Sequence, residues 1–358
     1  MAAIAAALPA LELDVIAFQE VWTEAARAQL LAGVRHAGLR HIWHNPGNTT
    51  GASGLLVASR LPMISAQFEA FTARGFAERI QHMDYYSGKG YTQIALETAQ
   101  GPIVIADTHL HANYTRKPGI DEYAGVRAAQ LIQIAAGLRN VSDPIISLGD
   151  FNTEEREPAY ALLTDLAGLR DVAVQLDRRQ MTSLADIPYH RVNHAEKRID
   201  YVFHRPGTAR RLRPVQIDRE FDAIFNVGDE AATFSDHAGL VASFEMEAAN
   251  STTRAPSEAV FQIGEQLLTH GREVSQHRQR HQRIGFAGAA ILGLASLAGA
   301  RKARQSRRQF LRRGLQAAGL LAAAGSAEQL VLSEMANPLE VDAYATAQQQ
   351  LNHLRRHP

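Results

Sequence analysis

The sequence IISLGDFN, residues 145–152, places polar side chains directly after a short apolar run. Residues 145–148 are predicted to form a strand because the run is brief and rich in branched apolar residues. Gly149 allows a tight exit from that strand, so Asp150 and Asn152 follow two residues apart on one side. A packed strand fixes the side chains that leave it. This segment therefore predicts a sheet-based protein with a polar site at a strand end.

The same alternation of strands and helices extends outward from this segment, as far as residue 246. Two of the expected strands lead into polar pairs, Gln19-Glu20 and Thr108-His109. Strands are expected at residues 13–18, 55–58, 94–96, 103–106, 145–148, 199–203 and 240–244, and helices at 24–37 and 121–138. The pattern predicts an α/β fold in which several strand ends carry polar side chains.

The composition is that of a folded protein with an uneven charge distribution. The 358 residues are 46% hydrophobic and 21% charged, which is enough to bury a sizeable core. Lys+Arg and Asp+Glu both number 37, yet residues 272–313 hold 11 Lys/Arg and a single acidic residue, Glu273. The rest of the chain therefore carries a net charge of about −10. The absence of cysteine excludes a disulfide framework, a zinc–thiolate site and a cysteine nucleophile.

The C-terminal third differs from the rest. Residues 284–300 are uncharged and lie between Arg283 and Arg301, close to the ~20 residues that a membrane span needs. A second uncharged stretch covers 314–327, and seven Lys/Arg fill 301–313. These features predict membrane attachment through paired hydrophobic helices, with a soluble helical hairpin as the alternative. If both apolar stretches insert, the basic loop at 301–313 should stay on the cytoplasmic side, which would place the catalytic domain on the other side. The basic residues of 272–283 argue against that orientation, so the side of the membrane on which the catalytic domain lies stays open.

Residues 306–311, SRRQFL, resemble a twin-arginine export signal, with an apolar run and small residues after them. A basic turn between two helices explains the same residues, and so does a reading frame joined to its neighbour. The expected domains are 1–246, catalytic; 247–283, linker and basic helix; 284–332, two hydrophobic helices with an Arg-rich loop; and 333–358, a polar tail. Deleting 258–358 is expected to release a soluble domain.

Four segments carry residues suited to catalysis, at positions 14–22, 106–114, 147–152 and 198–202 with 235–237. Each has an ordinary structural explanation when taken alone, such as a helix cap or a surface histidine pair. Together and in this order, QEVW, THL, GDFN, RIDYV and SDH resemble the successive motifs of the endonuclease/exonuclease/phosphatase superfamily over residues 10–246. The resemblance implies a four-layered α/β sandwich, with two packed mixed sheets flanked by helices, and a metal-dependent phosphodiesterase or phosphatase.

Within that superfamily the sequence is most similar to neutral sphingomyelinases of the membrane-anchored type. The similarity rests on THLHANY with the helix that follows it, on the loop from Asp84 to Lys89, and on the paired C-terminal hydrophobic helices. It implies Mg²⁺-dependent hydrolysis of a phospholipid headgroup ester at a membrane, with no protein partner. A nuclease of the same superfamily is the alternative, disfavoured by the negative catalytic region. A catalytically weakened, membrane-tethered homologue is a third.

The resemblance also implies ligands for the cation. Glu20 is expected to bind catalytic Mg²⁺, with Mn²⁺ as the alternative ion, because carboxylate oxygens are hard ligands. Asp236 is expected either to reach a second ion or to structure its turn.

The remaining motif residues receive roles in an in-line attack of water on phosphorus. His237 is expected to be the general base, and Asp200 to hold its imidazole in the correct tautomer. Asp150 and Asn152 are expected to position the water and a phosphate oxygen. His109 is expected to donate a hydrogen bond to a non-bridging oxygen.

Three further residues are candidates for substrate selection or regulation. His111 is assigned to substrate selection, and it would point to the same side as His109 if the strand continued that far. Asp84 and Lys89 form either a surface ion pair or a loop switch at the headgroup entrance.

The N-terminal region departs from the superfamily pattern. Members have an asparagine at the end of a first strand, 20–30 residues before the QE motif, whereas here 18 residues precede Gln19 and the first asparagine is Asn45. From this difference we expect either that the start codon of this sequence was placed too late or that the protein is a catalytically weakened or inactive member of the superfamily. The loss of a core strand would expose the backbone edge of its neighbour.

Overall fold

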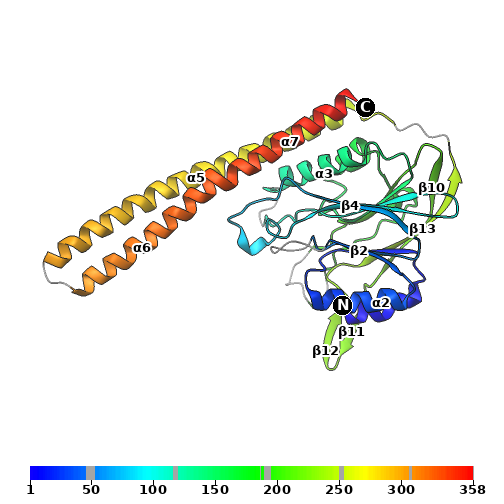
Figure 1. The fold of residues 1–358 in the computed structure, drawn as a ribbon, viewed down its shortest axis with the longest axis horizontal. Coiled ribbons are helices and arrows are strands. Elements are labelled where there is room, and N and C mark those ends of the chain that lie inside the picture. The colour runs from blue at the N-terminus through cyan, green and yellow to red at the C-terminus, as the bar shows by residue number, and fades with distance from the viewer. Residues whose placement is uncertain are drawn as a thin grey trace.

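Two regions make up the molecule, a layered α/β body and a helical arm that projects from it (Figure 1). The computed structural model describes residues 1–45, 53–115, 120–185, 187–188, 195–249, 254–305 and 309–357. Residues 306–308 of the twin-arginine-like segment, and parts of the expected loop at 45–54 and linker at 247–257, lie outside the described residues.

A six-stranded sheet forms the centre of the body. Its strand order is β4-β5-β6-β7-β9-β8, and its only parallel pair among the described residues is β6–β7, which α3 (Ala124–Leu138) connects. The strands are β4 (Met63–Ala70), β5 (Gly90–Leu96), β6 (Ile103–His109), β7 (Ile145–Asp150), β8 (Arg170–Asp171) and β9 (Asp200–Arg205). The four strands expected in this part of the chain are confirmed.

Shorter sheets pack against the central one. β1 (Val15–Phe18), β3 (Leu56–Ser59) and β2 (His41–His44) form one antiparallel sheet, and β10 (Arg210–Glu220) pairs with β13 (Gly239–Ala248) in another. A hairpin of β11 (Ile224–Val227) and β12 (Glu230–Thr233) projects from the body (Figure 1). Within the described residues β1 pairs only with β3, and β13 only with β10.

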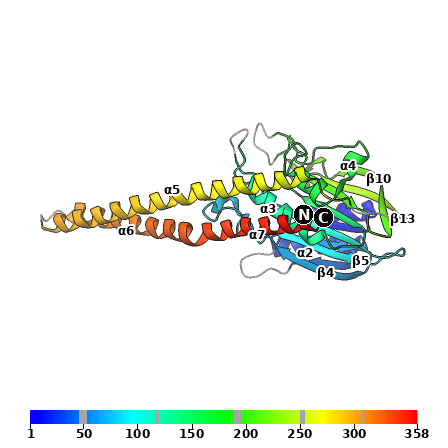
Figure 2. The same ribbon diagram turned by 90° about the horizontal axis from the view of Figure 1, so that it is seen from above.

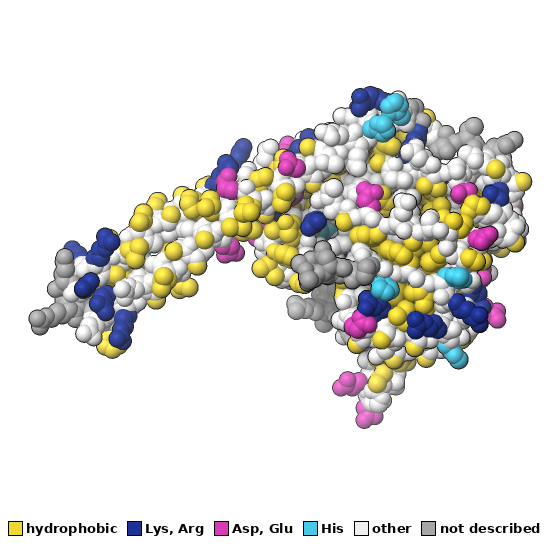
Figure 3. Space-filling view, in the orientation of Figure 1, with side chains coloured by type: hydrophobic (Ala, Val, Ile, Leu, Met, Phe, Trp, Pro, Cys, Tyr) yellow, Lys and Arg dark blue, Asp and Glu magenta, His cyan; other side chains and the backbone are white. Residues whose placement is uncertain are grey.

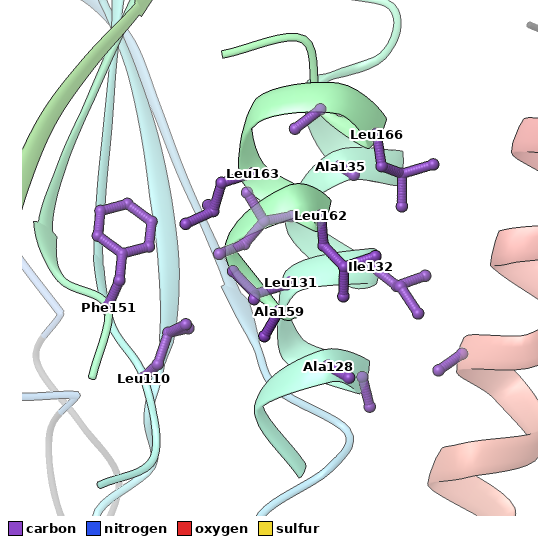
Figure 4. Close-up of a cluster of buried hydrophobic side chains, with 14 of the residues drawn as sticks. Leu110, Ala128, Leu131, Ile132, Ala135, Phe151, Ala159, Leu162, Leu163 and Leu166 are labelled. Atoms are coloured by element: carbon purple, nitrogen blue, oxygen red, sulfur yellow. The ribbon is translucent and has the colours of Figure 1, made fainter. Parts of the chain in front are cut away.

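Helices cover the outer faces of these sheets, which confirms the layered α/β sandwich. α1 (Ala2–Ala7) and α2 (Glu24–His36) lie on the side of β1–β3, and Thr23 caps α2 by accepting from the backbone N–H of Ala26. α3 covers the central sheet with an almost wholly buried, apolar surface. Figure 4 shows Leu110 and Phe151, just beyond two strand ends, facing leucines of α3 and of the turn Leu162–Leu166. The packed layer fixes the strand ends that carry the polar motifs.

The arm consists of long helices that leave the body and return to it. α5 (Glu258–Gln305) runs outward, and α6 (Gln309–Val331), η4 (Leu332–Ala336) and α7 (Asn337–Arg356) run back (Figures 1 and 2). Two helical stretches are long and apolar enough to cross a membrane. Figure 3 shows apolar side chains along the arm and Lys/Arg near its far end.

The segment expected as a polar tail is instead a packed helix. α7 lies beside α3 and α5 and buries Tyr344, Ala347, Leu351 and Leu354 in the main core. Its polar residues occupy the outer side, whereas the apolar ones recur every three or four residues and face inward. The average polarity of the segment concealed this periodicity.

Candidate active site

Strand pairing brings three of the predicted site residues together. The parallel register of β6 and β7 sets His109 opposite Asp150, and the antiparallel register of β7 and β9 sets Asp150 opposite Asp200. The Nε2 atom of His109 lies 3.4 Å from Oδ2 of Asp150. His237, from the loop before β13, completes the group, because its ligand atom and those of Asp150 and Asp200 lie within 4.8 Å of one another.

Asp150 and Asn152 lie on one side, as the sequence predicted, although β7 continues through Gly149 to Asp150 and the turn comes only after that. Gly149 has a φ of 129°, and a Cβ there would lie 2.0 Å from the carbonyl oxygen of Thr108, so only glycine fits. The backbone N–H of Asn152 donates to Oδ1 of Asp150 at 2.8 Å, and its Nδ2 donates to Oδ2 at 3.1 Å. Burial, and then the nearby charge of Asp200, raise the pKa of Asp150 to about 7.

His237 and Asp200 form an imidazole–carboxylate pair. Nδ1 of His237 lies 2.9 Å from Oδ2 of Asp200, which leaves Nε2 as the nitrogen for a substrate or water. The hydroxyl of Thr182 accepts from the backbone N–H groups of Ile199 and Asp200, both at 3.2 Å, and so fixes the start of β9. Burial alone would lower the pKa of His237, but the charge and hydrogen bond of Asp200 raise it to about 10.

Asp84 and Lys89 form a buried ion pair rather than a surface one. Their charged atoms lie 3.0 Å apart, and their side chains are 9% and 4% exposed. The ammonium of Lys89 also donates to Nε2 of His109 at 3.0 Å and to the carbonyl of Leu110 at 2.8 Å. All three N–H donors of Lys89 are therefore used inside the protein.

This ammonium changes what was expected of His109. Burial, and then the charge of Lys89, lower its pKa well below the usual value, so the imidazole is neutral. Because Nε2 accepts from Lys89, the ring proton belongs on Nδ1, which is buried. His109 and Lys89 thus act as one unit beside Asp150, and a donation from Nε2 to a phosphate oxygen would need the other tautomer.

The condition under which His111 would share a side with His109 is not met. β6 ends at His109, so the alternation of a strand no longer holds two residues later. The imidazole of His111 is 1% exposed, stacks on Tyr123 with 4.4 Å between ring centroids, and lies 3.5 Å from Asp84. The buried position of His111 does not support a direct contact with substrate. His111 instead packs against the carboxylate of Asp84 inside the protein.

Glu20 and Asp236, the two predicted metal ligands, lie on the wall of the cleft around this group. Glu20 has a φ of 60°, and Oε1 lies 3.9 Å from Nε2 of His109. Asp236 is exposed, and its carboxylate accepts from the hydroxyl of Ser235. Neither belongs to the compact group of Asp150, Asp200 and His237.

Sequence reasoning missed two buried acids that support the site. Asp107 lies inside β6 and accepts from Nε2 of Gln19 at 2.7 Å, which ties the strand before Glu20 to the central sheet. Burial raises the pKa of Asp107 well above its usual value. Both carboxylate oxygens of Asp171 accept hydrogen bonds from Nη2 of Arg198, each at 2.6 Å. The arginine of the RIDYV motif therefore has a structural role. A charged residue within an apolar strand was the available signal for Asp107.

The polar group opens into a large cleft of about 1140 Å³. Apolar side chains of both β1 and β13 line it, among them Phe18 and Phe244, together with Leu148 of β7. The polar residues Glu20, His109, Asp150 and His237 line the same cleft. The cleft thus combines a charged end with apolar walls between the sheets.

The donor set fits a divalent cation. Asp150 and Asp200 are close enough to repel each other when both are ionised, and this contributes to the raised pKa of Asp150. A divalent cation relieves such repulsion, and carboxylate oxygens suit Mg²⁺ or Mn²⁺. Glu20, which lines the same cleft, supplies a further carboxylate.

Fold and site together define a layered α/β sandwich with acids and imidazoles gathered at its strand ends. The model of the Endonuclease/Exonuclease/phosphatase family matches residues 1–237. The chain belongs to this family, which confirms the resemblance found in the sequence.

The curated relatives are sphingolipid phospholipases by name. The chain is 27% identical over 240 residues to a "Putative neutral sphingomyelinase" of Drosophila melanogaster, covering 65% of this chain and 53% of that protein. It is 30% identical over 173 residues to "Inositol phosphosphingolipids phospholipase C" of Saccharomyces cerevisiae, covering 47% of this chain and 36% of that protein. The chain thus spans about half or less of the length of these relatives.

Solved structures share the fold. D. rerio TDP2, crystallised with a single-strand DNA product, aligns with a TM-score of 0.54 at 17% identity, over 68% of this chain and 90% of that one. The likeness establishes the sandwich architecture.

Proposed function

We propose that this chain is a Mg²⁺-dependent phosphodiesterase that hydrolyses a phospholipid headgroup ester, in the manner of a sphingomyelinase. The observation that carries the proposal is the convergence of Asp150, Asp200 and His237 within 4.8 Å at the end of a cleft with apolar walls. The family and the names of the curated relatives support a hydrolase that acts on phosphodiester bonds.

Each residue of the cluster has a role in the attack of water on phosphorus. A divalent cation held beside Asp150 and Asp200 would offset the negative charge that raises the pKa of His237, and so would favour its neutral form. Nε2 of this neutral His237 would accept the proton of the water, while Asp200 holds Nδ1 and stabilises the imidazolium that forms. Asp150 and Asn152 align the water and a phosphate oxygen. Lys89, held against Nε2 of His109, places positive charge near the position of the phosphoryl oxygens. Mg²⁺, held by Glu20 and the acidic cluster, would polarise the phosphoryl group and oppose the charge of imidazolium.

The lipid substrate is supported by the walls of the cleft and by the arm. Phe18, Leu148 and Phe244 offer apolar surface next to the charged end, which suits a molecule with a phosphate between a headgroup and a hydrocarbon part. The arm exposes large apolar side chains, including Leu292 and Leu321, along helices long enough to enter a bilayer.

A side-by-side assay tests this function. The full chain is incubated with sphingomyelin, phosphatidylcholine or plasmid DNA, each with Mg²⁺ or with EDTA. We expect Mg²⁺-dependent release of a phosphorylated headgroup, and loss of about 10²–10⁴-fold in rate for His237→Gln because the general base is removed. His41→Gln, at an exposed site on β2, is the matched control and should keep full activity.

The other outcomes of this assay are equally specific. Cleavage of DNA alone would replace the lipid enzyme with a nuclease. A folded protein that turns over none of the three would be the weakened, membrane-tethered homologue.

Membrane attachment is tested by removing only the projecting part of the arm. Arg283 and Glu334 form an ion pair at 2.9 Å, so a short Gly/Ser loop can join them in place of residues 284–333. We expect this variant to leave the membrane fraction and remain active on lipid dispersed in detergent. A variant that stayed in the membrane pellet would remove the arm as the anchor.

A further inference from the structure

A continuous series of buried contacts joins the arm to the active site, beginning at Arg278 on α5. Its guanidinium lies 3.6 Å from the ring centroid of Phe76. The same group pairs with Glu78 of the body and Glu340 of α7, both at 2.7 Å. Arg278 therefore holds together the body, α5 and α7, six residues before the apolar run of the arm begins at Ile284.

The contacts continue as a stack of rings inside the body. Phe76 stacks on Tyr123 with centroids 4.5 Å apart, and Tyr123 stacks on His111 at 4.4 Å. The hydroxyl of Tyr123 lies 2.6 Å from Nδ1 of His82, which fixes the tilt of the ring. Phe76, Tyr123 and His111 are each 1% exposed, so none can move without displacing the next.

The series ends at the catalytic group. His111 lies 3.5 Å from Asp84, whose carboxylate also accepts from the backbone N–H of Ala112 at 2.8 Å. Asp84 holds the ammonium of Lys89 at 3.0 Å, and this ammonium donates to Nε2 of His109, also at 3.0 Å. The charge of Lys89 is thus held in place by Asp84, and Asp84 is supported by His111.

We propose that Arg278 is a positioning residue of the active site: through Phe76, Tyr123 and His111 it fixes the Asp84–Lys89 pair, and so the orientation of His109. The proposal rests on the proposed function and adds to it a dependence of the catalytic rate on how α5 leaves the body. The alternative is a purely structural role, in which Arg278 only neutralises Glu340 and stabilises the packing of α7.

The substitution Arg278→Lys separates these roles. Lysine keeps the positive charge near Glu340, but it lacks the planar guanidinium that covers Phe76 while pairing with two carboxylates. Arg283→Lys is the matched control, because Arg283 lies on the same helix and pairs with Glu334, outside the ring stack. Both are made in the full chain and assayed on sphingomyelin vesicles with Mg²⁺.

We expect Arg278→Lys to lower kcat by about 2- to 30-fold with little change in KM, and Arg283→Lys to change neither. Lys89→Met alone should also lower kcat, and adding Arg278→Lys to it should cause little further loss, because both act through the same ammonium. Independent, multiplicative losses in the double variant would overturn the proposal. So would a kcat unchanged by Arg278→Lys while the unfolding temperature falls.

Hydrogen–deuterium exchange gives a readout that needs no turnover. Peptides covering residues 82–90 and 109–113 should exchange faster in Arg278→Lys than in wild type, and unchanged in Arg283→Lys. Faster exchange without lipid hydrolysis in the wild type would retain the positioning path and reject the proposed function. Unchanged exchange would reject the path.

Discussion

The two halves of α5 have opposite surroundings within one continuous helix. In the half that touches the body, Val260, Phe261 and Leu268 are buried in the main core beside α3 and α7. In the projecting half, Ile284, Ile291, Leu292 and Leu294 are each about two-thirds exposed. The first half carries charged residues beside its buried apolar ones, whereas residues 284–300 of the projecting half are uncharged on every side. The difference teaches that only the projecting half has apolar surface to spare for a bilayer, whereas the first half belongs to the catalytic body.

The largest expected difference between the halves comes from deletion. Removing residues 258–358 would strip α5 and α7 from α3, take Leu268, Tyr344 and Leu351 out of the core, and expose the side of α3 that packs against these helices. We therefore expect an unfolded or aggregated product, contrary to the sequence-based expectation of a soluble domain. The Gly/Ser replacement of 284–333 should instead unfold cooperatively, as measured by circular dichroism on heating. A soluble, folded 1–257 fragment would show that the base of α5 is dispensable.

Single truncations of leucine should reproduce the contrast on a smaller scale. Leu351 is fully buried on α7, so Leu351→Ala should destabilise the body by about 2–5 kcal/mol through lost burial and a cavity. Leu321→Ala, at a site 75% exposed on α6, should change the unfolding of the body by less than about 0.5 kcal/mol. Urea unfolding followed by tryptophan fluorescence measures both, and equal effects would erase the distinction.

The same substitution on α5 should have opposite signs in its two halves. At Gly271 a Cβ would lie 2.8 Å from the ring of Tyr344 and 3.1 Å from Gly125, so Gly271→Ala should cost roughly 1–3 kcal/mol by forcing α3, α5 and α7 apart. At Gly288 a Cβ would meet nothing within 4 Å, and Gly288→Ala should favour the helix by up to about 1 kcal/mol. Thermal unfolding of the two variants provides the measurement, and a stabilising Gly271→Ala would contradict the tight crossing.

Acid should weaken the body through His204 while leaving the projecting helices intact. Burial, and then the charge of Arg170, lower the pKa of His204 to about 4, below its value of about 6.5 in the unfolded chain. The unfolded state therefore binds more protons between pH 6.5 and 4, so stability falls as the pH drops through that range. Between pH 7 and pH 5, the titration of His204 should lower the free energy of unfolding by about 2 kcal/mol or less.

His204→Gln isolates this share, and His36→Gln at an exposed site of α2 is the control. Stability measured against pH should fall less steeply for His204→Gln than for the control. Matching slopes would show that His204 is not protonated on unfolding.

The seven strands expected from the sequence are present as β1, β3, β5, β6, β7, β9 and β13, because short apolar runs express them locally, whereas β2, β4, β8 and β10 to β12 were not predicted. The run before Gly149 and the polar pair after it needed only short-range pattern and turn geometry to interpret, and the structure has this arrangement. The surroundings of His111 could not be predicted in this way, because they consist of Asp84 and Tyr123, which lie 27 and 12 residues away in the sequence.

By itself the sequence determined the layered α/β body, the acids and imidazoles at its strand ends, and the apolar run of the arm, because residue periodicity and turn residues express these directly. Only the tertiary structure decided that Lys89 is buried against His109, that α7 belongs to the core, and that Arg278 is linked to the active site through stacked rings. These features depend on contacts between segments that are distant in the sequence, and the packing of the whole chain determines those contacts.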